Sequence, residues 1–304
     1  MSGARREQHP VSDSQVPAIN KMSTVEEALE RGCRTLSARA GAEARREAGF
    51  LLAGVLDVAP GQVTLQRRRQ LAEHERDEYL NRLARRARGE PLQYIEGRAA
   101  FRELLLRVDR SVLIPRPETE QLVEAVLGWC RGKEGLSGLD LGTGSGAIAI
   151  SLAREAPFER VVGVDISAQA LNVARYNADQ AGVGEVVELR LGSLFAPLSA
   201  GERFQVVVSN PPYVANGEAE SLPEEVRDWE PAVALYAGPT GFEVIQQIVD
   251  RAAQYLAPGG LLALEVAPGV ADATLERLRA GGAYSEPRVI RDLAGQRRIV
   301  LAER

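Results

Sequence analysis

Apolar residues recur with a helical period in the first third of this chain of 304 residues. Between residues 22 and 90 they return every three or four positions, as at Ala48, Leu51 and Leu52, and so share one face of a helix. A Pro-Gly pair that begins at Pro60 interrupts the pattern as a turn does. The segment 22–90 is therefore predicted to be a small helical domain of about four or five helices.

The second part of the chain alternates short apolar runs with helical stretches. The apolar runs, typical of buried strands, fall near residues 138–141, 160–165, 186–191, 204–209, 260–266, 287–292 and 297–302. The helical patterns fall near residues 146–155, 168–181, 240–256 and 270–280. This alternation predicts an α/β fold over residues 116–304, a doubly wound, Rossmann-like sheet of seven mostly parallel strands. Ligands bind such sheets at the carboxyl ends of the strands.

Residues 91–115 follow neither pattern. Apolar side chains at Tyr94, Phe101 and residues 112–114 predict short strands, and Gly97 predicts a turn. We interpret residues 91–115 as a β-hairpin linker between the two domains.

The N-terminal segment, residues 1–21, is polar and has no periodic pattern, so we expect a disordered tail. It contains no apolar core, so no signal peptide is predicted. No apolar run in the chain approaches the roughly 18 to 20 residues of a membrane span. We therefore expect a cytoplasmic protein that does not associate with membranes.

The charge balance argues against a protein that grips long duplex DNA. The net charge is −5 and the isoelectric point about 5.4, whereas nucleic-acid-binding domains carry a basic patch or stripe. We therefore expect no stable nucleic-acid binding. The arginines at residues 67–69 are either a solvated face or a contact for an RNA-containing or acidic partner, and the sequence leaves both readings open.

Cysteine and histidine are too scarce for several kinds of site. The two cysteines, Cys33 and Cys130, stand far apart, and the two histidines, His9 and His74, lie in polar segments. A zinc cluster, a disulfide framework or a Ser-His-Asp triad needs more than this. No metal site is predicted, and the chemistry is expected to depend on a cofactor and on positioning.

A glycine-rich segment follows the first predicted strand of the second domain. It reads Asp140-Leu141-Gly142-Thr143-Gly144-Ser145-Gly146, and glycines let a backbone turn tightly and approach a ligand. Asp165 ends the next apolar run, where a carboxylate suits the hydroxyls of a ribose. Alone, the pattern also fits a purely structural turn between a strand and a helix. The candidate cofactor-binding residues here are Gly142, Thr143, Gly144, Ser145, Gly146 and Asp165.

These features fit a nucleoside cofactor without a pyrophosphate, because the dinucleotide fingerprint places its third glycine one position later. S-adenosyl-L-methionine meets that description. Asp165 would bind its ribose, and the glycine backbone would follow its methionine part, whose carboxylate suits a helix N-terminus. The product would be S-adenosyl-L-homocysteine.

A second motif, Asn210-Pro211-Pro212-Tyr213, follows the strand predicted at residues 204–209. It suits a planar NH2 group, which is a poor nucleophile because its lone pair is delocalised. The side-chain oxygen of Asn210 and the carbonyl of Pro211 can each accept one N–H, which fixes the nitrogen. The prolines stiffen the backbone, and Tyr213 can pack against a flat substrate group. We predict that these four residues catalyse a transfer mainly by positioning.

The chain resembles the class I S-adenosylmethionine-dependent methyltransferases that modify planar nitrogens. Within them it is most similar to the HemK/PrmC family, the peptide chain release factor N5-glutamine methyltransferases. The resemblance covers residues 23–304 and rests on Pro91-Leu92-Gln93-Tyr94-Ile95, Leu113-Ile114-Pro115-Arg116-Pro117-Glu118-Thr119-Glu120, residues 139–146, residues 209–213 and Glu230-Pro231 with residues up to Leu235.

The resemblance implies methylation of the side-chain amide nitrogen of the glutamine in the Gly-Gly-Gln motif of bacterial class-1 peptide release factors 1 and 2. It implies that residues 22–90 help to recognise this protein substrate and that residues 116–304 are catalytic. It also adds Ser193, Leu194 and Asn210 to the cofactor site.

Two positions depart from the family pattern. Relatives carry an acidic residue before a large apolar one where this chain has Ser193-Leu194, close to the expected adenine. The usual E-x-G-x-x-Q reads Glu265-Val266-Ala267-Pro268-Gly269-Val270, which we interpret as a variable surface turn.

Two other functions remain open from the residues alone. A DNA or RNA adenine-N6 methyltransferase shares the Asn-Pro-Pro-Tyr logic, but it needs a base-flipping surface, and no recognition module is evident. A non-catalytic binding module would keep the fold and the glycine loop, yet would have no need of a clamp for an NH2 group.

Overall fold

The computed structural model describes residues 22–304. The predicted disordered tail, residues 1–21, lies outside the described residues. The chain divides into two compact units, Met1–Arg88 and Gly89–Arg304. Within residues 22–304 no single helix is long and apolar enough to cross a membrane, and only the bent pair Val25–Leu56 with Pro60–Gln66 meets that test, by length and composition.

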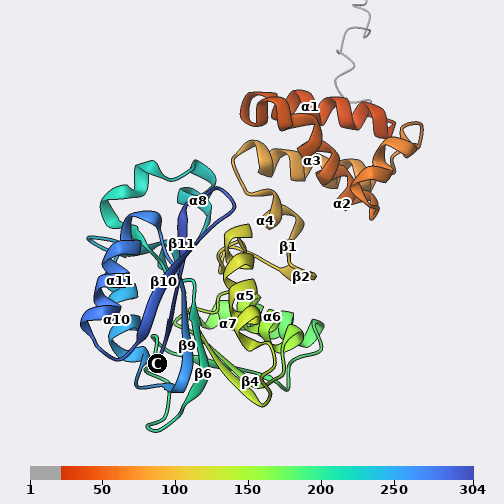
Figure 1. Cartoon of the computed structure of the whole chain (residues 1–304). Coiled ribbons are helices and arrows are strands. Elements are labelled where there is room, and N and C mark those ends of the chain that lie inside the picture. The colour runs from red at the N-terminus through yellow and green to blue at the C-terminus, as the bar shows by residue number, and fades with distance from the viewer. Residues whose placement is uncertain (1–21) are drawn as a thin grey trace, which may run out of the picture. The chain divides into compact units, whose positions relative to one another are not determined.

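The first unit is helical (Figure 1). In its described part, α1 (Val25–Ala40), α2 (Ala44–Leu56) and α3 (Glu73–Ala87) are joined by the 3-10 helices η1 (Gly41–Glu43) and η2 (Pro60–Gln66). The predicted count of four or five helices is thus reached only with the 3-10 helices included. A capping box of Thr24 and Glu27 begins α1. Tyr79 is fully buried and donates to the Ala48 carbonyl at 3.2 Å, which ties α3 to α2.

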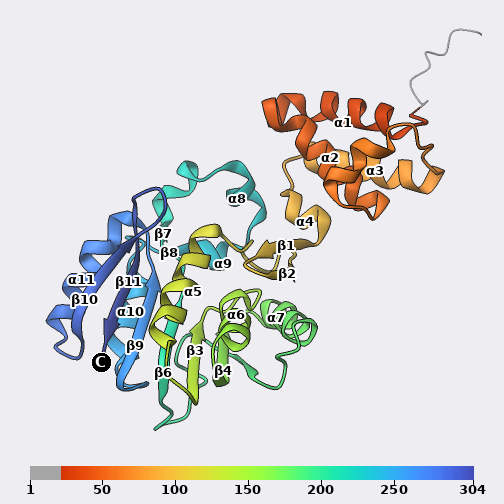
Figure 2. The same cartoon turned by 45° about the vertical axis from the view of Figure 1, so that its right-hand side comes forward.

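The second unit is built on the predicted seven-stranded sheet (Figure 2). Its order is β10-β11-β9-β6-β3-β4-β5, and the strands are β3 (Leu136–Leu141), β4 (Phe158–Asp165), β5 (Val187–Leu191), β6 (Phe204–Ser209), β9 (Leu256–Glu265), β10 (Ser285–Arg291) and β11 (Arg297–Glu303). The five strands from β9 to β5 pair in parallel, and β11 pairs antiparallel with both β9 and β10, so β11 alone runs against the other six strands. The strand order reverses between β3 and β6, so the crevice beyond their carboxyl ends is the expected ligand position.

Helices cover both faces of this sheet because the strands are apolar on both sides. Neighbouring residues such as Val206 and Val207 belong to the two separate cores, as the two-residue period of a strand requires. The helices α5 (Pro117–Cys130) and α6 (Ala147–Glu155) pack in one core, and α10 (Glu243–Ala252) and α11 (Ala271–Ala280) pack in the other. The helix α7 (Ala168–Gln180) lies on the α6 side (Figure 2).

Residues 91–115 contain a hairpin, but not all of it is extended. The strands β1 (Arg98–Phe101) and β2 (Leu104–Arg107) pair antiparallel. Tyr94, which we expected in a strand, lies in the short helix α4 (Leu92–Glu96), and residues 112–114 form no strand. The side chains of Tyr94, Val112 and Ile114 are instead buried in one local cluster, whereas Leu113 is half-buried. The Tyr94 hydroxyl donates to the Val112 carbonyl at 2.6 Å.

An insertion between β6 and α10 has no counterpart in the predicted elements. It consists of β7 (Val214–Ala215), η3 (Asn216–Ser221), α8 (Glu224–Trp229), α9 (Ala232–Leu235) and β8 (Tyr236–Gly238). The strands β7 and β8 pair with each other in parallel, outside the main sheet. The insertion follows directly on the Asn-Pro-Pro-Tyr motif, so it builds one wall of the site.

Candidate active site

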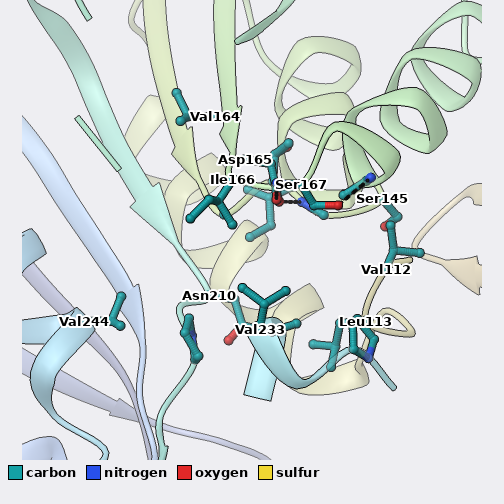
Figure 3. A pocket seen from close by; sticks show the side chains of 18 of the residues that line it. Val112, Leu113, Ser145, Val164, Asp165, Ile166, Ser167, Asn210, Val233 and Val244 are labelled. Atoms are coloured by element: carbon teal, nitrogen blue, oxygen red, sulfur yellow. Dashed lines mark hydrogen bonds between the residues drawn. The ribbon is translucent and has the colours of Figure 1, made fainter. Parts of the chain in front are cut away.

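A cavity of about 280 Å³ lies at the carboxyl ends of the strands in the second unit. It is bounded by the loop after β3, the ends of β4 and β6, the segment that leads into α5, and α9 (Figure 3). Several predicted site residues line this one cavity: Gly142, Thr143, Gly144, Ser145, Asp165, Ser193, Leu194, Asn210 and Pro212. The two sequence motifs therefore meet where the sheet order reverses.

The glycine loop turns through left-handed conformations at Gly142 (φ 74°) and Gly144 (φ 55°), which glycine adopts without strain. A methyl group added to Gly142 would meet no atom within 4 Å, so this side of the loop is open. Gly146 differs, because it does not line the cavity and its added Cβ would lie 2.9 Å from Ile150 Cδ1. Gly146 is required by the packing of α6, not by approach to a ligand.

Asp165 lies at the end of β4 and holds the loop from the side. One carboxylate oxygen accepts the Gly144 N–H and the other accepts the Ser167 N–H, both at 2.9 Å. A carboxylate oxygen has two lone pairs, so each oxygen can accept one more hydrogen bond. Figure 3 shows Asp165 next to Ile166 and Ser167 above the cavity.

Beneath the loop, Asp140 is fully buried. Its Oδ2 accepts the Thr143 hydroxyl at 2.6 Å, whereas Oδ1 has no partner among the described residues. Burial raises the pKa of Asp140 to about 7, although the Thr143 bond opposes the shift. Asp140 thus anchors Thr143 from below.

The Asn-Pro-Pro-Tyr segment leaves the sheet at the end of β6. Ser209 donates to the Leu141 carbonyl at 2.6 Å and so joins the end of β6 to the end of β3. Asn210 and Pro212 line the cavity, whereas Pro211, which is buried, and Tyr213 do not. Tyr213 is half-buried, packs against the core on the α10 side, and has a pKa raised to about 12 by burial. Gly241 allows a close approach here, because a Cβ on it would lie 2.5 Å from the Tyr213 carbonyl oxygen.

Asn210 is hydrogen-bonded to Thr119, which in turn contacts Glu265, and the sequence analysis did not predict either as a site residue. Thr119, in the first turn of α5, accepts the Asn210 Nδ2–H at 3.0 Å and donates its hydroxyl to Glu265 Oε2 at 2.7 Å. Glu265 ends β9 and is 1% exposed, so the expected surface turn is wrong at this position. Its pKa is raised to about 7 by burial, which outweighs the Thr119 hydrogen bond.

Ser193 and Leu194 retain their place at the cavity despite their departure from the family pattern. Leu194 adopts a left-handed backbone conformation (φ 48°), and its side chain packs against the core on the α10 side. Ser193 is exposed. The backbone here turns away from β5, and neither side chain is acidic.

A buried ion pair fixes the insertion against the segment that enters α5. Glu230 pairs with Arg116 and also accepts the Ile114 N–H at 3.2 Å. Burial raises the pKa of Glu230, and the Arg116 charge partly offsets this. Arg116, Pro231 and Val233 all line the cavity, so the pair sets the position of one wall.

Comparison with known proteins places this geometry in a family. The PrmC N-terminal domain model matches residues 27–97, and the methyltransferase small domain model matches residues 122–225. The release factor glutamine methyltransferase of Moorella thermoacetica is 40% identical over 92% of this chain and 99% of its own length. Its counterpart in Koribacter versatilis is 36% identical over the same shares, and that of Gloeobacter violaceus is 45% identical over 69% of this chain and 73% of its own length.

A solved structure, the Thermus thermophilus 16S rRNA N2 G1207 methyltransferase in complex with AdoMet and guanosine, supports the fold. It superimposes with a TM-score of 0.51 at 22% identity, over 68% of this chain and 49% of its own. The fold and the site define a class I S-adenosylmethionine-dependent methyltransferase. Within that class, the chain belongs to the release factor glutamine methyltransferase family, which confirms the family predicted from the motifs.

Proposed function

We propose that this enzyme methylates the side-chain amide nitrogen (N5) of the glutamine in the Gly-Gly-Gln motif of bacterial peptide release factors 1 and 2. The observation that carries the proposal is that Asn210 lines the same cavity as the open glycine loop and Asp165. The relatives' name, release factor glutamine methyltransferase, supplies the substrate class.

The cavity fits the proposed cofactor, S-adenosyl-L-methionine. Asp165 retains lone pairs that suit ribose hydroxyls, and the open face of Gly142 admits close approach of a ligand to the backbone. Thr143, Gly144, Ser145, Ser193 and Leu194 complete the proposed cofactor wall. When bound, the cofactor supplies an electrophilic methyl carbon and leaves as S-adenosyl-L-homocysteine.

The protein's own contribution is to fix the acceptor nitrogen. The Asn210 side-chain oxygen and the Pro211 carbonyl each accept one hydrogen of the glutamine NH2 group, so the nitrogen can turn its lone pair toward the methyl carbon. Pro211 and Pro212 have no N–H that would compete. Correct placement of two reacting groups can lower a barrier by about 7–11 kcal/mol.

Tyr213 acts in this scheme by supporting the turn. Its half-buried ring packs against the core, so it holds the Pro211 and Pro212 backbone in place from behind.

We assign recognition of the release factor to the helical domain, residues 22–90, and catalysis to residues 116–304, with residues 91–115 as the linker. The helical segment matches the PrmC N-terminal domain, and a protein substrate needs a larger contact than the cavity offers. The net charge of −5 agrees with a protein partner and with no stable nucleic-acid binding.

The test is methyl transfer from labelled S-adenosylmethionine to purified release factor. Parallel samples contain a release factor with Gln→Asn in its Gly-Gly-Gln motif, duplex DNA, and the Asn210→Ala enzyme. We expect label on the unaltered release factor only, and loss of label with Asn210→Ala although that variant still binds the cofactor. Label on DNA instead would favour an adenine-N6 methyltransferase, and equal activity of Asn210→Ala would contradict the proposed clamp.

A further inference from the structure

The amide of Asn210 is held at only one of its two ends. Its Nδ2 donates to Thr119 Oγ1 at 3.0 Å, and within residues 22–304 its Oδ1 makes no hydrogen bond. Both Asn210 and Thr119 line the cavity, whereas Glu265 stands behind Thr119 and does not. An amide that is tied by its nitrogen leaves its oxygen free to accept a hydrogen bond from a ligand.

While Glu265 is ionised, the hydrogens in this chain of bonds can be placed in only one way. A carboxylate only accepts, so the one hydroxyl hydrogen of Thr119 goes to Glu265, at 2.7 Å. The Thr119 oxygen then has only lone pairs left, and it can hold Asn210 only by accepting from Nδ2. The ionised carboxyl of Glu265 therefore determines, two bonds away, which end of the Asn210 amide faces the cavity.

Burial makes this constraint costly to break. Thr119 is 5% exposed and Glu265 is 1% exposed, so loss of either hydrogen bond would leave a largely buried polar group without a partner. The three groups come from α5, β9 and the end of β6, which are far apart in the sequence. The orientation of Asn210 is thus built into the packing of three separate elements.

We infer that Thr119 and Glu265 are positioning residues, which commit the Asn210 amide to the orientation that accepts an N–H of the substrate. The inference rests on the proposed function, in which Asn210 binds the acceptor NH2 group. Without the Thr119 hydroxyl, the amide is free to turn by half a rotation and point its own NH2 at the substrate NH2. Two donors would then face each other, and the acceptor nitrogen would lose its alignment.

The decisive variants differ in one hydroxyl group. Thr119→Val keeps the shape of the side chain but has no hydroxyl, and Thr119→Ser keeps the hydroxyl. We expect Thr119→Val to lower kcat for methylation of release factor by roughly 10²-fold, the effect of misplacing a reacting group by about 1 Å. KM for the release factor and the affinity for S-adenosylmethionine should stay close to those of the unaltered enzyme, and Thr119→Ser should recover most of kcat.

Thr274→Val is the matched control. Thr274 is fully buried and donates its hydroxyl to the Val270 carbonyl at 2.8 Å, but it does not line the cavity. The control reports the general effect of removing a buried threonine hydroxyl and should keep kcat. The inference is overturned if Thr119→Val keeps full kcat, or if Thr119→Ser is as impaired as Thr119→Val.

Nuclear magnetic resonance can report the hydrogen bonding of the Asn210 side-chain amide in the absence of catalysis. The side-chain NH2 signal of Asn210, assigned by its loss in Asn210→Ala, should show one hydrogen-bonded proton in the unaltered protein and in Thr119→Ser. In Thr119→Val the chemical shift of that proton should move to the value of an amide proton without a hydrogen bond. An unchanged signal would overturn the inference. Full activity of Asn210→Ala would instead contradict the proposed function, so the two failures are distinguishable.

Discussion

At the scale of single residues, the proposed role of Glu265 gives the reaction a pH dependence. The groups that face this carboxyl are Arg116, Glu118 and Tyr213, together with Arg298 from β11, and its pKa is about 7. The orientation of Asn210 requires the ionised carboxylate, so kcat should rise with pH and level off above about 7. A kcat–pH profile at saturating substrates measures this.

The variant Glu265→Gln tests whether the expected rise of kcat with pH is due to Glu265. The glutamine can turn either its oxygen or its NH2 group toward Thr119, so kcat should be lower, and because it does not titrate, kcat should be flat through neutral pH. Asp140 also has a pKa of about 7, so it is the competing source. A rise that persists in Glu265→Gln and disappears in Asp140→Asn would assign the titration to Asp140.

Asp140 itself should make folding stability depend on pH. Burial raises its folded-state pKa to about 7 from an ordinary value of 3.8, so the folded protein holds a proton that the unfolded chain has released. Stability is therefore lost as pH rises through this window. Asp140→Asn keeps an acceptor for Thr143 and does not titrate, so its stability relative to the unaltered protein should be higher at pH 8 than at pH 4, by about 3–4 kcal/mol. Denaturant unfolding at both pH values tests this, and an equal difference at both would contradict it.

Two glycines of the loop should respond differently to the same substitution. In Gly146→Ala the new methyl would lie 2.9 Å from Ile150 Cδ1 at a φ of 83°, so unfolding free energy should fall by about 1–3 kcal/mol. In Gly142→Ala the methyl meets no protein atom within 4 Å, so stability should fall only by the backbone strain of a φ of 74°, about 1 kcal/mol, and the larger change should be weaker cofactor binding. Unfolding and calorimetric titration of both variants separate the effects, and a reversed pattern would refute the distinction.

These residues show how far the sequence could lead. The Asn210 motif and the glycine loop each occupy consecutive positions, so their chemical roles can be predicted from the sequence before the fold is known. Thr119 and Glu265 are separated by 146 positions, and each alone looks like an ordinary helix-start or strand-end residue. Only the packing of α5 against β9 brings them together.

At the scale of elements, the insertion from β7 to β8 should depend on the Glu230–Arg116 ion pair. The Glu230 side chain is 2% exposed, so Glu230→Ala leaves Arg116 and the Ile114 N–H without their partner. Breaking a buried ion pair costs about 3–5 kcal/mol, and the partial exposure of Arg116 places the expected loss at the lower end. Because the pair positions Pro231 and Val233, KM for the release factor should rise as well.

Asp250→Ala is the control for that change. Asp250 pairs with Arg277 between α10 and α11, and both side chains are substantially exposed, at 37% and 45%. Loss of an exposed ion pair changes stability by at most about 1 kcal/mol. Thermal unfolding and steady-state kinetics compare the two variants, and equal effects would show that the Glu230 pair has no special structural role.

Elements with a local sequence pattern could likewise be predicted, whereas elements positioned by distant contacts could not. The five inner strands of the sheet, β11, β9, β6, β3 and β4, are predictable because each contains an apolar run that is buried on both faces, whereas the edge strands β10 and β5 are largely exposed. The insertion has short elements with mixed composition, and its position is set by the Glu230 and Trp229 contacts, which no local pattern reveals. Tyr94 was misassigned because a buried aromatic residue is equally compatible with a strand and with the one-turn helix between Pro91 and Gly97.

At the scale of the whole molecule, the two units have separate cores and separate proposed tasks. The helical unit buries Leu51, Leu52 and Tyr79, and its Arg86–Glu47 ion pair is internal. The cavity is lined entirely by residues of the second unit. Cofactor binding should therefore be independent of the helical unit, whereas recognition of the release factor should not.

A chain limited to residues 89–304 tests whether the helical unit is needed for recognition of the release factor but not for cofactor binding. Its affinity for S-adenosylmethionine should match that of the full chain, because every lining residue is retained. With a whole release factor, kcat/KM should fall at least about tenfold, which corresponds to about 1.4 kcal/mol of lost binding. With a short peptide that contains Gly-Gly-Gln, too small to reach a second surface, the full and shortened chains should have the same kcat/KM. Equal activity on the whole release factor would show that the helical unit does not recognise the substrate, and loss of cofactor binding would show that the catalytic unit depends on it for folding.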